Sequence, residues 1–202
     1  MNVTLNLVRM NNMLLKLKLN NKPNQNLAVE KATPMSSAPL KYFPDGRVDW
    51  GNMWDSFCAL PRDGGPPHRA AMLYADETAD TAGESYQLAT GEIIRGIAAV
   101  SGLTAEPAGP GWIAVHCHSA AMARWLSEAI TQENVQARCH GSTLFVPAGA
   151  GFSLKGEIKN VITAVAKTSH YWQEHLPVEV KRTLALREWL LGVRARFFPE
   201  FS

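Results

Sequence analysis

Four segments between residues 84 and 197 carry apolar residues three and four positions apart, the spacing of one face of a helix. Gly102 directly after the first segment is typical of a left-handed helix C-cap, and Ser119 before the second is typical of an N-cap. The pattern predicts helices over 84–101, after Ser119, over about 155–174 and over about 178–197.

Short apolar runs between these segments predict strands. They lie at 68–76, at 111–117 and at 135–148, where the last run forms a hairpin around His140 and Gly141. The predicted order is therefore β-α-β-α-β-β-α. This order favours an α+β fold with a small mixed sheet covered by helices, and the nearest common architecture is a ferredoxin-like two-layer sandwich.

Two further elements flank the predicted core domain at 68–176. Within residues 36–67, Asp49 is a candidate N-cap for a short aromatic helix, Trp50–Phe57, which Pro61 ends. We expect this helix to act as a lid over the core. Residues 177–202 form a C-terminal helix with a basic excess beside an apolar stripe.

The N-terminal tail, residues 1–35, differs in composition from everything that follows. Residues 1–29 contain eight Asn and no Asp or Glu, whereas only three Asn come after Met35. The alternatives are a disordered tail, a targeting segment, or an artefact in which translation begins at Met35.

Composition narrows the class of protein. Hydrophobic residues make up 46% of the chain and charged residues 19%, which is sufficient for a globular core. The formal charge of +2 does not predict a nucleic-acid partner, and no apolar run is long enough for a transmembrane helix. Three widely spaced cysteines do not form a disulfide framework, which favours reduced thiols and a cytoplasmic location.

The loop Gly149–Gly151 is the preferred candidate site. A glycine-rich turn that leads into a helix presents backbone N–H groups to an anion, although neither standard nucleotide-binding pattern is present. We therefore predict a small anionic ligand at this turn. The expected ligand-binding residues are Gly149, Gly151, Ser153, Lys155, Lys159 and Asn160, with Trp54 and Trp172 as pocket walls.

An enzyme is the first alternative. His170 and Glu174 stand four residues apart, a spacing that lets a carboxylate orient an imidazole, and Lys167 precedes them on the same helix. These three residues are the candidate acid–base groups. A solvent-exposed helix face explains the same pattern.

A metal centre is a weaker version of this alternative. His116, His118 and His140 would converge if their strands paired in a suitable register. Arg138 beside His140 would repel a cation, so no metal is favoured and the cofactor stays unknown.

A third alternative is an interaction or assembly protein. It would dock on a protein partner, or on a second copy of itself, through the Trp50–Phe57 helix and the basic C-terminal helix. An anionic membrane is a further conceivable partner for the C-terminal helix.

Overall fold

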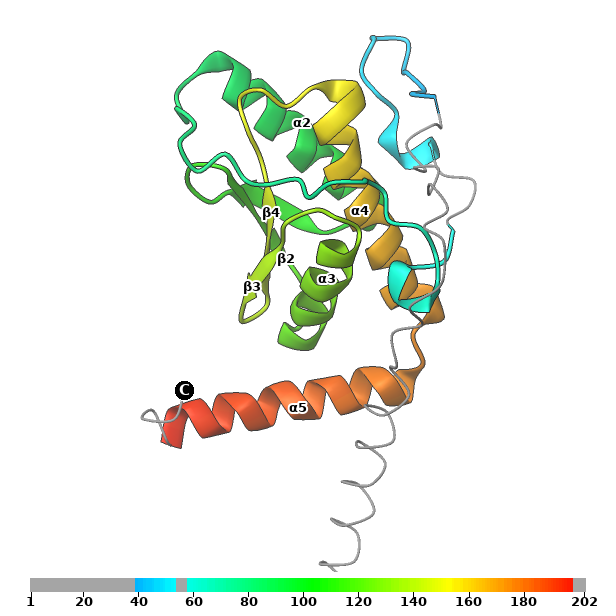
Figure 1. Ribbon diagram of the computed structural model, residues 1–202, viewed down its shortest axis with the longest axis vertical. Helices are drawn as coiled ribbons and strands as arrows, with labels where there is room; N and C mark the ends of the chain where they lie inside the picture. Colours follow the sequence, from blue (N-terminus) through cyan, green and yellow to red (C-terminus); the bar gives the residue numbers. More distant parts are fainter. Residues whose placement is uncertain (1–38, 54–57, 198–202) are drawn as a thin grey trace, which may run out of the picture. The chain divides into compact units, whose positions relative to one another are not determined.

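The computed structural model describes residues 39–53 and 58–197 (Figure 1). The α-helices are α2 (Glu84–Ser101), α3 (Ala120–Gln132), α4 (Lys159–His170) and α5 (Val178–Phe197). The strands are β1 (Thr104–Pro107), β2 (Trp112–His116), β3 (Arg138–His140) and β4 (Thr143–Pro147). Two 3-10 turns, η2 (Trp50–Asn52) and η3 (Pro61–Asp63), and two π-helical turns, η4 (Leu154–Ile158) and η5 (Tyr171–His175), complete the set.

The four strands form one antiparallel sheet in the order β1-β2-β4-β3. Strand β2 pairs with β4 from Trp112 opposite Pro147 to His116 opposite Thr143. Helices α2, α3 and α4 lie on one side of this sheet (Figure 1). The chain therefore has an α+β fold with a small helix-covered sheet, as predicted, but the sheet is antiparallel rather than mixed.

The connectivity differs from the predicted order at two places. Residues 68–76 were expected to be a strand, but there Leu73 makes only an isolated parallel bridge with Val135. Residues 104–107, which none of the predicted strands covers, form the edge strand β1. The sheet thus consists of two hairpins, β1–β2 and β3–β4, and shares the two layers of a ferredoxin-like sandwich without its strand order.

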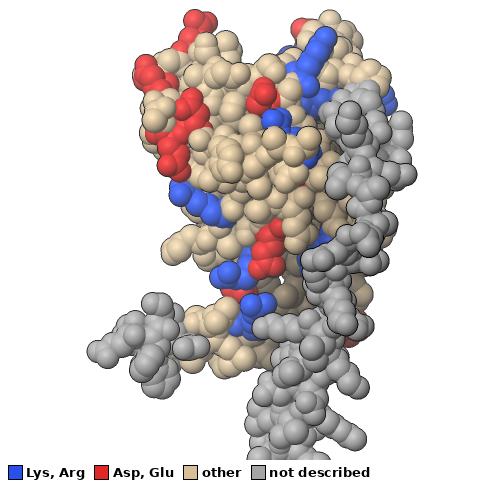
Figure 2. Space-filling view, viewed as in Figure 1, with Lys and Arg blue, Asp and Glu red and all other residues tan. Residues whose placement is uncertain are grey.

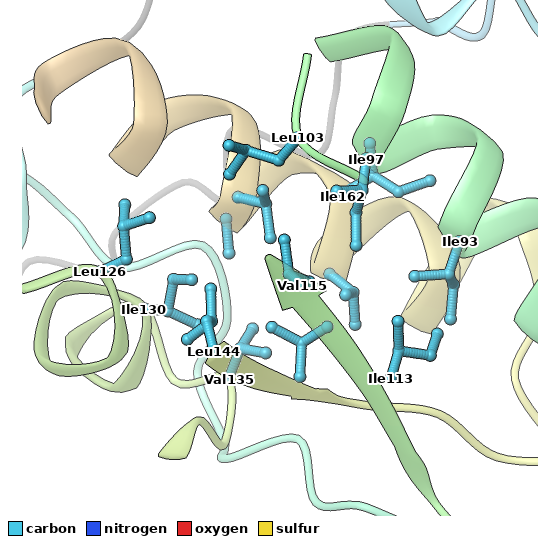
Figure 3. Close-up of a cluster of buried hydrophobic side chains, with 14 of the residues drawn as sticks. Ile93, Ile97, Leu103, Ile113, Val115, Leu126, Ile130, Val135, Leu144 and Ile162 are labelled. Carbon is cyan, nitrogen blue, oxygen red and sulfur yellow. The ribbon is translucent and has the colours of Figure 1, made fainter. Parts of the chain in front are cut away.

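The core lies between the sheet and the helices. Ile113 and Val115 of β2 point toward Ile93 of α2 and Ile162 of α4, and all four side chains are fully buried (Figure 3). Cys117, which follows β2, belongs to the same cluster, and Cys139 of β3 packs against it. Both sulfurs therefore lie on the core side of the sheet, together with Ile113 and Val115, as expected for alternate residues of a strand.

Helices α2 and α4 approach closely at Gly96. An added Cβ at this position would overlap the Cδ1 atom of Ile162. The glycine therefore allows the two helix backbones to come together over the core.

The predicted helix ends are largely confirmed. Gly102 ends α2 with a φ of 70° and donates its N–H to the carbonyl of Ala98. Ser119 caps α3, because its Oγ accepts the N–H of Met122 at 3.1 Å. Asp49, in contrast, makes no capping hydrogen bond at η2, and the predicted aromatic helix is only the turn Trp50–Asn52 within the described residues. Residues 54–57 lie outside them.

Helix α5 contacts α3, where Arg124 Nε lies 2.5 Å from Glu188 Oε1. Val180 and Leu184 of α5 line a hollow of about 370 Å³ together with Trp125 of α3 and Tyr171 of η5. Of the helices in the described part of the chain, none combines the length and the apolar character needed to cross a bilayer.

Candidate functional site

A surface hollow of about 540 Å³ lies beside the glycine loop. Its apolar wall comes from α2 on one side and from the segment after the loop on the other. The apolar residues that line it include Val48, Leu88, Ala89, Phe152, Leu154 and Ile158. The loop itself contributes Ala150, so the hollow begins at the turn that the sequence singled out.

Two charged side chains line this hollow, Arg47 and Glu92. The Glu92 carboxylate accepts hydrogen bonds from Trp50 Nε1 at 2.7 Å and from Arg95, so its negative charge is balanced within the protein. Arg47 pairs with Asp45 at 2.7 Å, and both side chains are well exposed. Because exposed ion pairs contribute little free energy, a bound anion can compete with Asp45 for the guanidinium of Arg47.

The helix N-terminus after the loop already carries a carboxylate. Glu157 Oε2 accepts hydrogen bonds from the N–H and from the hydroxyl of Ser153, each at 2.9 Å. Burial raises the pKa of the Glu157 carboxyl, but these hydrogen bonds outweigh it and hold the pKa below its usual value. The protein therefore supplies its own anion at the position where we expected the ligand.

The other predicted donors do not converge on the hollow. Lys155 is exposed, Lys159 is buried with a pKa that burial lowers, and Asn160 donates its side-chain N–H to the carbonyl of Gly156 at 2.7 Å. Gly149 is buried against the ring of Phe152, whereas Gly151 is open.

Of the two predicted walls, only Trp172 lies in the described part of the chain, and it does not line the hollow. Trp172 packs on Trp125 at the far end of α4, 18 residues after Leu154 and thus roughly 27 Å along the helix axis. Trp54 lies outside the described residues.

The most unusual polar cluster of the described structure is fully enclosed. Lys167 Nζ of α4 lies 2.7 Å from Glu133 Oε1, and the exposed fraction of both side chains is 0%. The other carboxylate oxygen of Glu133 accepts the N–H of His68 at 3.0 Å and lies 2.8 Å from His68 Nδ1. Lysine, glutamate and histidine thus form one buried chain of contacts.

The positive partners determine the ionisation of Glu133. Burial raises the pKa of this carboxyl, but the hydrogen bonds and charges of His68 and Lys167 more than compensate and lower it below its usual value. Lys167 also donates to Cys58 Sγ at 3.3 Å. Buried, mutually perturbed groups of this kind occur at functional sites and in structural ion-pair networks alike.

The three predicted acid–base residues differ in their burial and in their contacts. Lys167 is enclosed with Glu133, Glu174 is exposed, and His170 has its Nε2 atom 3.2 Å from Nε2 of His175. His170 precedes the π-helical turn η5, in which residues five apart come together rather than residues four apart, and this matches the contact between His170 and His175. The alternative explanation, a solvent-exposed helix face, also does not hold for α4, because its polar residues Lys159, Thr163 and Lys167 are buried.

The three histidines proposed as metal ligands occupy separate positions. His116 and His140 lie on either side of Thr143 with β4 between them, so their backbones are two strand spacings, roughly 10 Å, apart. His116 Nε2 lies 3.1 Å from Glu106 Oε1, and His118 is an exposed residue after the strand. Among residues 39–53 and 58–197, no group of three or more His, Cys, Asp or Glu residues is arranged to hold a metal ion.

The proposed docking face around Trp50 is internal where the structure describes it. The side chains of Trp50 and Met53 are buried, with exposed fractions of 0% and 3%. Both residues belong to the buried hydrophobic cluster of the core.

Sequence reasoning missed His68 and Glu133. Each stands alone between elements, and no spacing rule relates them to Lys167. It also missed Arg47, which reaches the hollow from a turn far from the glycine loop in the chain. The chain matches no known protein-family model and no curated protein.

Proposed function

We propose that this protein binds a small ligand with an anionic group and an apolar body in the hollow beside the Gly149–Gly151 loop. The observation that carries the proposal is the lining of the hollow, which combines an apolar wall with one exposed guanidinium. The volume of about 540 Å³ lies in the range of small-molecule sites.

The proposal assigns the binding of the anionic group to Arg47 rather than to the Ser153 amide. Glu157 occupies the Ser153 amide and would repel an anion there, so the recognition group becomes Arg47. The planar guanidinium suits a carboxylate or a phosphate, which it can bind through two hydrogen bonds. Leu88, Phe152 and Leu154 would cover the apolar part of the ligand.

An acid–base enzyme is a weaker proposal. Lys167 and Glu133 are enclosed on all sides, and neither lines any of the described hollows of about 370 to 540 Å³. A substrate would need an opening of the core to reach them. The buried cluster therefore supports stability more directly than chemistry.

The test is chemical-shift mapping with butyrate, hexanoate, octanoate, the matching alcohols and inorganic phosphate. We expect octanoate to perturb backbone signals at 47–48, 88–92 and 150–154 more strongly than octanol. Arg47→Gln should weaken octanoate binding by about tenfold, because a hydrogen bond to a charged group contributes roughly 1.5–3 kcal/mol.

A pair of neighbouring substitutions on α2 provides the control. Leu88→Glu places a negative charge on the wall of the hollow and should weaken octanoate binding by at least about tenfold. Gln87→Glu adds the same charge one residue earlier, where the side chain lines a different hollow, and should leave binding nearly unchanged. Absence of any response near residues 150–154, or equal losses from both variants, would refute the proposal.

A further inference from the structure

Helix α5 carries two apolar stripes on nearly opposite sides. Leu184 is partly buried and lines the hollow with Trp125, together with Val180, which is 41% exposed; these two residues form the stripe beside the body of the protein. Leu186 follows Leu184 by two residues, roughly 200° around the helix axis, and begins the second stripe. Leu186, Trp189, Leu190 and Val193 then recur at the spacing of one helical face.

The second stripe is open to solvent. The exposed fractions are 55% for Leu186, 63% for Trp189 and 52% for Leu190, so three large apolar side chains lie next to one another on the surface. Contiguous exposed apolar surface of this kind marks an interaction site in soluble chains.

The charges around the stripe define the kind of partner. Over Val178–Phe197 the sequence has five basic residues (Lys181, Arg182, Arg187, Arg194 and Arg196) and two acidic ones (Glu179 and Glu188), a net charge of +3. Glu188 is already paired with Arg124, and Lys181 donates to the carbonyl of Gln173 on the body side. Arg182 and Arg187 are exposed beside the stripe.

The rest of the visible surface carries both signs of charge. Figure 2 shows acidic side chains gathered at the upper left of this face, and basic side chains mainly at the upper right and lower down. Within the described residues, the basic excess is therefore a local property of α5.

We propose that the second stripe of α5 docks on an anionic lipid surface. A helix that places Trp and Leu toward the acyl boundary and arginines beside them is suited to lie in the plane of a membrane interface. A second copy fits less well, since pairing two α5 stripes would bring +3 against +3. Trp189 would sit at the level of the lipid headgroups, where indole rings are favoured.

The experiment is cosedimentation of the full chain with two kinds of vesicle. One is pure phosphatidylcholine and the other is an equimolar mixture of phosphatidylcholine and phosphatidylserine. We expect binding to the mixed vesicles only, and we expect it to decrease as the salt concentration rises. Arg182→Gln and Arg187→Gln should each lower the partition coefficient by about fivefold.

Substitutions within the stripe separate insertion from charge attraction. Trp189→Glu should reduce binding to the mixed vesicles by at least about tenfold. Tyr74→Glu, which changes an equally exposed aromatic residue away from α5, should not. Trp189→Phe should keep most of the binding but lose the fluorescence quenching that brominated lipids cause.

Three results would overturn the proposal. The first is no binding to phosphatidylserine vesicles, and the second is equal binding to both kinds of vesicle. The third is a dimer in sedimentation velocity that Trp189→Glu dissociates, because this would assign the stripe to a second copy. Circular dichroism of each variant should match the wild type, since the substituted side chains are exposed.

Discussion

At the scale of single residues, the enclosed pair Lys167–Glu133 makes the stability of the protein sensitive to the loss of either partner. Lys167→Met would leave the Glu133 carboxylate buried beside His68 alone. Breaking a buried pair by removing one partner costs about 3–5 kcal/mol, so we expect a loss of that size in urea unfolding.

The control and the double variant make this prediction specific. Lys155→Met removes an exposed lysine one helical segment earlier and should change the free energy of unfolding by less than about 0.5 kcal/mol. Lys167→Met combined with Glu133→Gln should cost less than the sum of the two single changes, because no buried charge is left uncompensated. A strictly additive result would show that the pair is not coupled.

The lowered pKa of Glu133 predicts a dependence of stability on pH. The carboxyl has a lower pKa in the folded protein than its ordinary value of 4.5, so it binds protons less readily when folded. Its contribution is therefore fully present above about pH 5 and is lost as the pH falls through the folded-state pKa.

The measurement compares wild type with Glu133→Gln in urea at several pH values. We expect the difference in unfolding free energy to be largest near pH 6 and to shrink steadily toward pH 3. A difference that grew on acidification would reverse the assigned sign and exclude an ionised Glu133 in the native state.

At the scale of elements, the approach of α2 to α4 depends on the missing side chain of Gly96. Gly96→Ala would gain helix propensity, but its Cβ would overlap Ile162, a fully buried residue. Overpacking of this kind costs about 1–3 kcal/mol, so the net effect should be destabilising in thermal or urea unfolding.

Gly91 on the same helix is the matched control. An added Cβ there meets nothing within 4 Å, and Gly91→Ala should stabilise the protein by about 0.5–1 kcal/mol. Equal effects of the two substitutions would mean that α2 does not pack on α4 as described.

The elements also show what sequence patterns can and cannot predict. Helix α2 was predicted with its bounds and its glycine cap, because eighteen residues of helical periodicity followed by Gly102 are a local signal. The β3–β4 hairpin was equally local, and Gly141 in its turn has a φ of 56°. Residues 68–76 are apolar although they do not form a strand, because Leu73 packs into the core from a loop. The Leu73 N–H donates to the carbonyl of Asn134.

The candidate sites depended on long-range contacts that periodicity does not contain. The glycine loop was found because the turn is local, but Arg47 reaches the same hollow from about a hundred residues earlier. His68 and Glu133 meet across 65 residues, and Lys167 is enclosed in a structure in which α4 packs on α2 and α3. A lysine on an amphipathic helix is usually exposed, so the pattern alone favoured the opposite placement.

At the scale of the whole molecule, Cys117 can report whether the core opens as one unit. Burial raises the pKa of this thiol to about 12, so almost none of it is the reactive thiolate at pH 8 while the protein is folded. Alkylation by iodoacetamide should therefore require an opening of the core, whereas the half-buried Cys139 should react at lower urea concentrations. Peptide mass spectrometry distinguishes the two sites.

The variants of α2 then decide how large that opening is. Gly96→Ala changes a contact between helices and leaves Cys117 itself untouched, so it can accelerate alkylation of Cys117 only if both sites open together. If the opening is global, each 1.4 kcal/mol lost in urea unfolding should speed alkylation about tenfold, and Gly91→Ala should slow it. Alkylation of Cys117 that is unchanged in both variants would mean that the end of β2 opens independently of the α2–α4 packing.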